Sequence, residues 1–535
     1  MDMFSVGIAV SILLYVLVGN YAGRKVKGLD DYFVAGRRSP TLLIVGTLVA
    51  SFLSTNAFLG ETGFAYEGYG FLLLVLIAIN TTGYVVGALF FGRFVRRSGA
   101  LTLPEYFGRR FNSRRVQVVT GITIVVGLAA YLLAVTQGAS LIISEVVDIP
   151  YGLTLLIVWL GYTLFTLYSG SQGVVITDTL MFLLFTVVAF LALPYIVDGS
   201  GGWFDTIQAL ATYEAKPDII AWHGVNGDGA YWSTPGEALI WALILGVSWA
   251  TVLAVSPWQT SRYLMARNEH TVIRSACISG GILMLLYIAL VVSGAAINLD
   301  NPNIETSNKA IIWAAMNMMP TWLGVLLMAG LMAAALSSAS TFLSLIGFSV
   351  SHDIVRFKGR TDASSLRITR WTMLVVGLIV LVLAYAQPPA VMWITYFAGT
   401  LFASSWGPVA FMSIWSRHIT EAAAFWGILA GFIGNIAAKL LSKFGVLELP
   451  VYLDPFIVGL VLSIATIMLI SRMTRVSQQE SDYRLQIHRT PASEFDAGEL
   501  RQTLVWSKAL MVLGVATSVF LVVMYALPYG NAVGG

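Results

Sequence analysis

Four hydroxyl side chains fall close together in one long apolar segment, 323–350. They are Ser337, Ser338, Ser340 and Thr341. Hydrocarbon offers a hydroxyl no hydrogen-bond partner, so such groups must face protein, water or an ion. Positions 337, 340 and 341 have the spacing that places residues on one face of a helix. Several neutral oxygens on one face suit a hard monovalent cation such as sodium, and hydrogen bonding between packed membrane helices is the alternative explanation.

Two further apolar segments carry polar interruptions at corresponding places. In the first, residues 50–56 (ASFLSTN) put three hydroxyls and an amide in mid-segment, and Gly60 follows. Ser, Thr and Asn compete for backbone hydrogen bonds and therefore favour local unwinding. Five segments later, 246–251 (GVSWAT) and then Ser256-Pro257 repeat the pattern. Interrupted segments at matching places in two halves indicate a transporter's midplane site, and the odd offset predicts a five-plus-five inverted repeat.

The elements that must position these residues are membrane helices. The 535 residues are 57% hydrophobic and only 11% charged, which is typical of a polytopic membrane protein and excludes a soluble enzyme. The chain is therefore predicted to be all-α, with about fourteen spans. We place these spans at 4–23, 41–60, 72–95, 116–144, 151–169, 174–197, 236–257, 273–297, 323–350, 368–386, 390–416, 422–442, 454–472 and 506–527.

The placement of charge along the chain predicts its orientation. All but four of the 31 Lys and Arg residues fall in one set of alternate connections and the span ends beside them. Cytoplasmic loops carry this excess, so the pattern predicts a multi-pass protein of the cell membrane with both termini outside. The four exceptions, on the opposite side, are Lys216, Lys309, Lys439 and Lys443. The basic loops are thus a topology signal, and no nucleic-acid site is predicted.

Two loops differ from the short connections elsewhere. The outer loop 198–233 contains Trp203, Trp222 and Trp232 and is predicted to fold as a cap over the exterior. The inner loop 473–505 is polar, and we interpret it as a solvated linker to the last helix.

Several spaced motifs, in order, resemble those of the sodium/solute symporter family, and the similarity covers about residues 25–420. The motifs are 31–37 (DYFVAGR), 103–107 (LPEYF) with 109–111 (RRF), 257–259 (PWQ) with Arg262, Tyr263, Ala266 and Arg267, and 333–340 (AAALSSAS). The resemblance implies a sodium-coupled symporter that imports a small organic solute by alternating access. It also implies a LeuT-like architecture: an N-terminal extra helix and inner loop in 1–40, a ten-helix transport core in 41–416 and three appended helices in 417–535.

The resemblance further implies where sodium binds. The main site of the family joins the unwound first core helix to the eighth. The matching positions are Ala50, Leu53 and Ala334 through backbone carbonyls and Ser337 and Ser338 through hydroxyls. An unwound turn frees carbonyl oxygens, and the two hydroxyls complete an all-oxygen shell.

Some family members hold a second sodium with an acid in the fifth core helix, and Asp178 matches that position. A carboxylate inside a span is a functional candidate by default. Its expected co-ligands are Ser337, Ser340 and Thr341. The alternative is an interfacial aspartate at a helix N-terminus, where the helix dipole favours it.

Substrate groups are expected between core helices one, two, three, six and ten, and the identity of the solute stays open. The candidates are Ser54, Asn56, Tyr131, Gln137, Trp249, Thr251, Trp393, Tyr396 and Thr400. A membrane enzyme is excluded as an interpretation because the five His lie outside the spans and show no catalytic or metal-ligand spacing. A transport-like sensor or an ion channel remains the alternative. Partners are thus the solute and the bilayer, and the sequence indicates no obligate protein partner.

Overall fold

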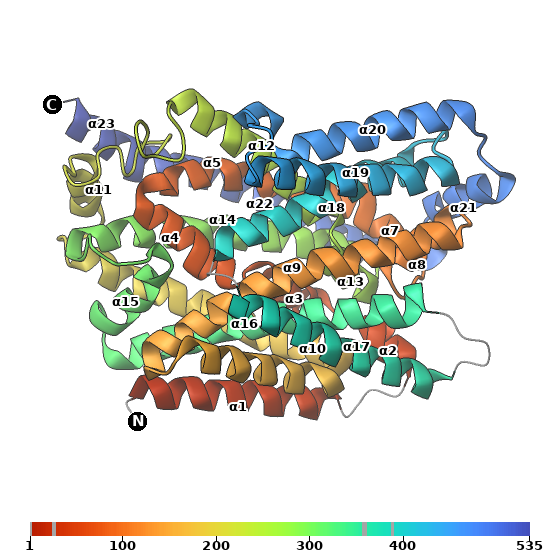
Figure 1. Ribbon diagram of the computed structural model, residues 1–535, viewed down its shortest axis with the longest axis horizontal. Coiled ribbons are helices and arrows are strands. Elements are labelled where there is room, and N and C mark those ends of the chain that lie inside the picture. Colours follow the sequence, from red (N-terminus) through yellow and green to blue (C-terminus); the bar gives the residue numbers. More distant parts are fainter. Residues whose placement is uncertain (1–2, 24–27, 356–360, 387–389, 535) are drawn as a thin grey trace.

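The computed structural model describes residues 3–23, 28–355, 361–386 and 390–534, and most of them are helical. The helices lie side by side along the long axis of the molecule, and both chain ends are found at the same end of this bundle (Figure 1). In chain order the helices of the first half are α1 (Met3–Gly23), α2 (Leu29–Val34), α3 (Thr41–Phe52), α4 (Thr62–Phe64), α5 (Gly70–Asn80), α6 (Thr82–Gly87), α7 (Arg93–Arg97), α8 (Leu103–Arg110), α9 (Arg114–Val147), α10 (Tyr151–Asp198), α11 (Trp203–Ala211) and α12 (Pro235–Val255).

The second half continues the bundle and adds helices at its edge. These are α13 (Pro257–Met265), α14 (Glu269–Asp300), α15 (Ala310–Asn317), α16 (Thr321–Phe348), α17 (Asp362–Ala386), α18 (Val391–Trp415), α19 (Glu421–Lys443), α20 (Pro455–Met473), α21 (Gln478–His488), α22 (Ala497–Leu521) and α23 (Leu527–Val533). Wider helical turns join some of them, namely η2 (Asn56–Glu61), η3 (Ala65–Tyr69), η4 (Ala88–Gly92), η6 (Ser349–Ile354) and η9 (Val522–Ala526).

The predicted spans are found as helices. Twelve described helices are long and apolar enough to cross a membrane, and two shorter apolar helices cover Thr41–Phe52 and Tyr151–Leu167. Together they account for the predicted spans, because 151–169 and 174–197 are the two parts of α10. These parts meet at Gly170, which has a φ of 56° and whose added Cβ would lie 2.7 Å from the Tyr32 ring. Only glycine adopts this positive φ without strain and also has no Cβ to clash with the Tyr32 ring.

The two interrupted segments differ from each other. Helix α3 ends at Phe52, Leu53 is extended, and helical backbone resumes at Asn56 and continues, beyond the predicted boundary at 60, to a kink at Gly68, which has a φ of 109°. By contrast, α12 runs without interruption through 246–251, so the expected unwinding there is wrong. The break in this segment comes at Ser256, whose ψ of 151° is extended, and Pro257 then starts α13. A proline favours an extended residue before it and fits the first turn of a helix.

The outer loop 198–233 folds as predicted, whereas the inner loop 473–505 does not. The outer loop folds against the bundle, since Lys216 Nζ donates to the Tyr66 carbonyl at 3.0 Å and Trp232 is buried among other rings. The inner loop is not a solvated linker. It contains α21, which has a Ser477–Glu480 capping box, and Arg110 donates to the Glu480 carbonyl at 3.2 Å. Helix α21 is therefore docked on α8.

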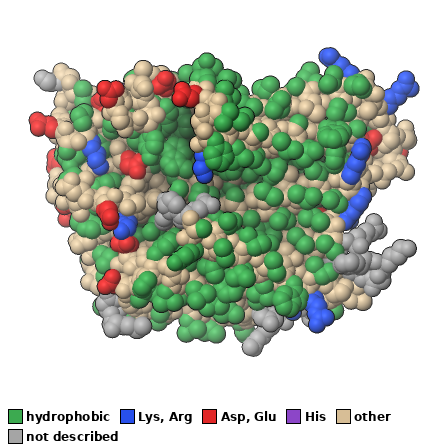
Figure 2. Space-filling model, viewed as in Figure 1, with side chains coloured by type: hydrophobic (Ala, Val, Ile, Leu, Met, Phe, Trp, Pro, Cys, Tyr) green, Lys and Arg blue, Asp and Glu red, His purple; other side chains and the backbone are tan. Residues whose placement is uncertain are grey.

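Charge is segregated along the bundle. On the face seen in Figure 2, Lys and Arg gather at the end that carries α8 and α21, while most Asp and Glu lie toward the other end. At the basic end, Glu105 of α8 lies 3.2 Å from His352 of η6. Burial raises the pKa of Glu105, but hydrogen bonds from His352 and the Leu101 amide outweigh it and bring the pKa to about 2. The Glu105 carboxylate is therefore charged at neutral pH, and its contact with His352 ties the two elements together.

Candidate functional site

The break after α3 lies against α16 and brings a free carbonyl to a hydroxyl. Leu53 has a ψ of 91° and the helix does not continue, so carbonyls near the end of α3 lose their helical partners. The Ser338 hydroxyl lies 3.5 Å from the Ala50 carbonyl oxygen, and both residues are fully buried. Ala334 and Leu53 are also fully buried. The sequence-predicted pair Ala50 and Ser338 is thus brought together across two helices.

Asp178 of α10 forms a second polar cluster in the interior. Its Oδ1 accepts a hydrogen bond from Ser337 at 2.6 Å, and its Oδ2 accepts one from Thr47 of α3 at 2.5 Å. The Arg262 guanidinium of α13 lies 3.4 Å from the same Oδ2 and also donates to the Thr341 hydroxyl. The carboxylate is 0% exposed and the arginine 2%. Asp178 is therefore a buried ion-pair partner as well as the acceptor of two hydroxyls.

The hydroxyl face of α16 divides between these two clusters. Ser338 faces α3, while Ser337 and Thr341 face Asp178 and Arg262. Ser340 does neither, because its hydroxyl donates to the Ser337 carbonyl of its own helix at 2.9 Å. Of the residues predicted to surround Asp178, the structure gathers Ser337 and Thr341 and leaves Ser340 turned toward its own backbone.

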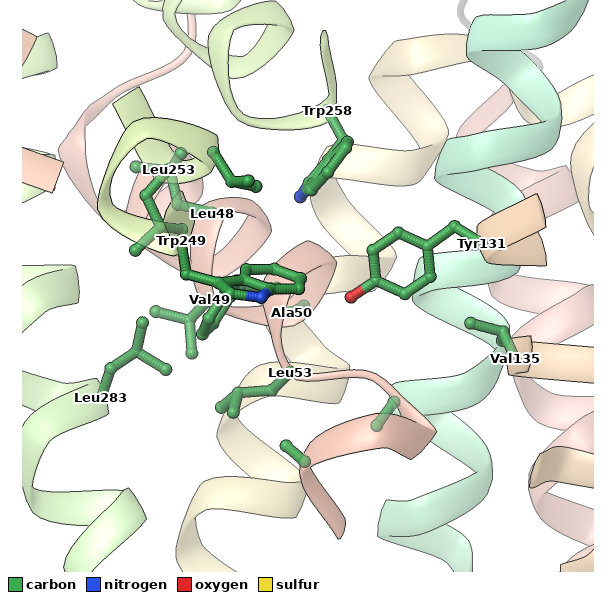
Figure 3. Packing of buried hydrophobic residues seen from close by; sticks show 14 of the residues in the cluster. Leu48, Val49, Ala50, Leu53, Tyr131, Val135, Trp249, Leu253, Trp258 and Leu283 are labelled. Atoms are coloured by element: carbon green, nitrogen blue, oxygen red, sulfur yellow. The ribbon is translucent and has the colours of Figure 1, made fainter. Parts of the chain in front are cut away.

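Aromatic side chains line the interior beside the break. In the view of Figure 3 the Tyr131 hydroxyl is directed toward the break, and Trp249 packs against Phe52, the last residue of α3, with ring centroids 6.0 Å apart. Tyr131 of α9 packs edge-on against Trp258 of α13, with ring centroids 5.4 Å apart, and its hydroxyl interacts with Ser54. Ser54 itself accepts a hydrogen bond from the Asn56 amide at 3.1 Å. The predicted residues Ser54, Tyr131 and Trp249 therefore share one region.

Glu61, at the end of η2, is the centre of a third polar cluster. Its Oε1 accepts hydrogen bonds from Asn56 Nδ2 and from the Tyr396 hydroxyl, both at 3.0 Å. The Tyr287 hydroxyl of α14 is also near the carboxylate. Glu61 is only 6% exposed, and its second oxygen, Oε2, has no hydrogen-bond partner among the described residues. Two of the predicted substrate residues, Asn56 and Tyr396, thus converge on a carboxylate that the sequence analysis did not select.

Packed rings extend from Tyr396, through Trp393, to a hollow at the end of the bundle with the long loop. Tyr396 packs against Trp249 and Trp241, with centroids 5.5 and 6.2 Å apart, and Trp393 packs against Phe64 at 6.1 Å. The hollow has a volume of about 210 Å³. Its lining includes Gly60, Phe64, Glu67, Tyr231, Met392 and Trp393.

The remaining predicted substrate residues form hydrogen bonds outside these clusters. Gln137 of α9 accepts a hydrogen bond from the Ala390 amide at 3.4 Å, at the start of α18. The hydroxyls of Thr251 and Thr400 donate to carbonyls of their own helices, those of Val247 and Phe397. The Thr251 methyl group packs where Gly407 of α18 leaves space.

The sequence analysis missed four residues of these clusters, namely Thr47, Glu61, Arg262 and Tyr287. Charged residues inside membrane segments are functional candidates by default, and this signal would have selected two of them. Glu61 was passed over because the second span was ended at 60. Arg262 was counted with the basic connections, although it is buried. Thr47 carries no signal that distinguishes it from other threonines in spans.

Comparison with known proteins agrees with this architecture. Residues 32–431 match the model of the "Sodium:solute symporter family". The sodium/pantothenate symporter of Escherichia coli is 24% identical over 77% of this chain and 85% of its own length. The sodium/proline symporter of Salmonella typhimurium is 23% identical over 88% of this chain and 94% of its own length.

Solved structures show the same fold. A Na+-coupled sialic acid symporter in a substrate-bound outward-open state superposes with a TM-score of 0.74, covering 89% of this chain and 99% of that one, at 19% identity. Mhp1, a nucleobase-cation-symport-1 family transporter, gives a TM-score of 0.52 over 85% of this chain and 98% of that chain, at 14% identity. The all-α, LeuT-like fold expected from the sequence is confirmed, whereas its division into 1–40, 41–416 and 417–535 stays a prediction.

Proposed function

The chain belongs to the sodium:solute symporter family, and from this membership and the geometry above we propose where its coupling ion binds and how the site works. The protein is a membrane transporter, not an enzyme, and it couples solute import to sodium. Family membership does not favour the sensor or channel alternative.

We propose that the main sodium ion binds between the α3 break and α16. Its ligands are the carbonyl oxygens of Ala50, Leu53 and Ala334 and the hydroxyls of Ser337 and Ser338. The observation that carries this proposal is the approach of the Ser338 hydroxyl to the Ala50 carbonyl at 3.5 Å. These two buried oxygens, one of them a carbonyl at a broken helix end, are two of the five proposed ligands. Irregular backbone inside a membrane protein is tolerated where it lines such a site.

Ser337 links this site to Asp178, because its hydroxyl donates to the Asp178 carboxylate at 2.6 Å. A hydroxyl that donates its proton to a carboxylate keeps its lone pairs free for a cation. Asp178 thereby orients Ser337 toward sodium, whether or not it binds an ion itself.

We propose further that Asp178 is an exchangeable second cation site. In the arrangement described, the Arg262 guanidinium compensates the carboxylate and contacts Thr341, which is where sodium was expected. Two cations beside one buried carboxylate repel each other strongly in low dielectric. Sodium can therefore enter this cluster only when the guanidinium withdraws. We expect one sodium ion to be transported per solute while Arg262 pairs with Asp178, and two sodium ions when this ion pair is broken.

The proposed orientation places the basic end, with α8 and α21, in the cytoplasm. The end with α11, α15 and the long loop then faces outward, and solute enters through the hollow of about 210 Å³ at that end. The cell membrane is the proposed location because most Lys and Arg lie at one end of a helical bundle long enough to span it.

The main site can be tested without knowing the solute. Purified protein is heated in sodium chloride or in potassium chloride at equal ionic strength, and its unfolding is followed by tryptophan fluorescence. Preferential binding to the folded state raises the unfolding temperature as the ion concentration rises. A saturable, sodium-selective increase is expected, and identical curves in both salts would contradict the site.

A further inference from the structure

Glu61 is a buried carboxylate that has no cationic partner among the described residues. None of the ion pairs formed by the described residues involves it, and its neighbours are an amide and two phenols. Arg262 already pairs with Asp178, while Lys216 and Lys309 are bound elsewhere in the outer region. Removing a carboxylate from water is costly unless a cation or a proton compensates it. The proposed sodium transport does not use this group.

Two oxygens of this cluster are left as unused hydrogen-bond acceptors. Because Asn56 Nδ2 donates to Glu61 Oε1, the amide is oriented with its oxygen away from that bond. Both Asn56 Oδ1 and Glu61 Oε2 lack hydrogen-bond partners among the described residues. An ammonium group has several N–H donors and a positive charge, so it satisfies both atoms at once. A neutral hydroxyl could supply one donor but would leave the charge uncompensated.

One of these acceptors, Asn56 Oδ1, lies beside a residue that lines the outer hollow. An added Cβ on Gly60 would lie 2.7 Å from Asn56 Oδ1 and 3.1 Å from Met392 Cβ, and both Gly60 and Met392 line the hollow. A volume of about 210 Å³ is smaller than the pockets of drug-sized ligands, which start at roughly 300 Å³. The hollow therefore admits a solute of amino-acid size.

The walls around the carboxylate are aromatic. Tyr396, which donates to Glu61, packs against Trp249 at 5.5 Å, and Trp249 packs against Phe52 at 6.0 Å, so three rings in contact end at the carboxylate. Aromatic faces attract cations and also cover the apolar part of a small ligand. This environment distinguishes a charged nitrogen with N–H groups from an anion, which Glu61 would repel.

We infer that Glu61 is the substrate anchor of this transporter and that its solute carries a protonated primary or secondary amine. The amine donates to Glu61 Oε2 and to Asn56 Oδ1, while Tyr396 holds Oε1 in place. This inference rests on the proposed sodium-coupled function and adds the chemical class of the solute. Glu67 lines the hollow above Glu61 and gives the entrance the same negative sign.

The test uses the full-length purified protein in sodium chloride and matched pairs of solutes. Each amine is compared with an isostere in which carbon or oxygen replaces nitrogen: L-proline with cyclopentanecarboxylate, L-alanine with isobutyrate, and 2-aminoethanol with ethylene glycol. N,N-dimethyl-L-proline keeps the charge but lacks the N–H groups, and D-pantothenate lacks the amine. Binding is measured as an increase in the unfolding temperature and as a change in the tryptophan fluorescence.

At least one amine is expected to bind, while its isostere binds at least tenfold more weakly. Glu61→Gln keeps the size of the side chain and should lower amine affinity at least tenfold, and Glu61→Asp should retain part of it. Glu305→Gln, with a side chain 88% exposed in the same outer region, is the matched control and should bind like the unmodified protein.

Several results would overturn the inference. They are binding of isosteres or pantothenate but of no amine, no response to any amine, or amine affinity unchanged in Glu61→Gln. An altered sodium response of Glu61→Gln without solute would assign the carboxylate to an ion instead, and so would also overturn it. Failure of the proposed function looks different, because the unmodified protein would then show no sodium-selective stabilisation at all.

Discussion

Ser338 is the side chain whose role in sodium binding is tested most directly. It donates to a carbonyl at a broken helix end, and alanine removes this oxygen while keeping a residue that helices favour. Ser338→Ala should raise the sodium concentration for half-maximal stabilisation about tenfold, which corresponds to about 1.4 kcal/mol. Sodium titration of the unfolding temperature measures this change.

The control lies on the same helix. Ser344 is buried and its hydroxyl contacts neither Ala50 nor Asp178. Ser344→Ala should leave the sodium titration unchanged. If both variants behave like the unmodified protein, the main ion site does not include Ser338.

The second prediction for a single residue concerns Arg262. Arg262→Gln leaves the buried Asp178 without its cation, and breaking such a pair typically costs about 3–5 kcal/mol. The variant should therefore be less stable in potassium and should recover much of this loss in sodium, because sodium can then occupy the carboxylate. Unfolding temperatures in both salts measure the recovery.

The double variant Arg262→Gln with Asp178→Asn removes both charges and should show no such extra recovery. A sodium effect in Arg262→Gln no larger than in the unmodified protein would mean that Asp178 is a structural partner of the arginine and not a cation site.

At the level of helices, the approach of η2 to α18 fixes the position of Asn56 and Glu61. An added Cβ on Gly60 would lie 3.1 Å from Met392 Cβ and 3.2 Å from Met392 Cα. Gly60→Ala must therefore push the two elements apart, and overpacking of this kind costs about 1–3 kcal/mol. We expect weaker solute binding with a nearly unchanged sodium titration, because the α3 break lies on the other side of η2.

Gly280 of α14 provides the comparison for this substitution. The nearest atom to its added Cβ is the Thr81 carbonyl oxygen at 3.6 Å, an ordinary contact. Gly280→Ala should leave both solute and sodium binding unchanged. Equal behaviour of the two alanine variants would show that the packing of η2 on α18 does not position the solute site.

The helices themselves could be predicted from the sequence. The site could be predicted only where polar side chains coincide with a break in the backbone helix. Apolar runs fix the spans because hydrocarbon permits only closed backbone hydrogen bonding. The unwinding at 50–56 was found because three hydroxyls and an amide compete for the backbone there. The same reasoning failed at 246–251, where Pro257 alone decides the break and the polar residues are accommodated within a continuous helix.

Residues that meet across distant helices were harder to predict. Thr47 and Arg262 reach Asp178 from 131 and 84 residues away, and no local pattern encodes that meeting. Glu61 meets Tyr396 across 335 residues. Its own signal, a carboxylate in an apolar segment, was present in the sequence and was lost only through the placement of one helix boundary.

The whole molecule is polarised, and this polarity underlies the orientation in the membrane that we propose. Basic residues gather at the end with α8 and α21, while Glu61, Glu67 and the hollow lie toward the other end. A membrane with a negative interior favours entry of each positive charge by about 2.3 kcal/mol per 100 mV. With the acidic hollow outward, a cationic amine and sodium are both drawn inward by the same potential.

The last prediction tests this orientation in cells. Cys277 is the chain's only cysteine, so Cys277→Ala gives a background without thiols. Glu214→Cys places an exposed thiol in the long loop, and Gln478→Cys places one at the start of α21. A maleimide that cannot cross membranes should label the first variant in intact cells and the second only after permeabilisation. The reason is that Lys and Arg resist transfer across the membrane, which keeps the end with α21 inside. The reverse labelling pattern would mean that the protein has the opposite orientation in the membrane, with the hollow on the cytoplasmic side.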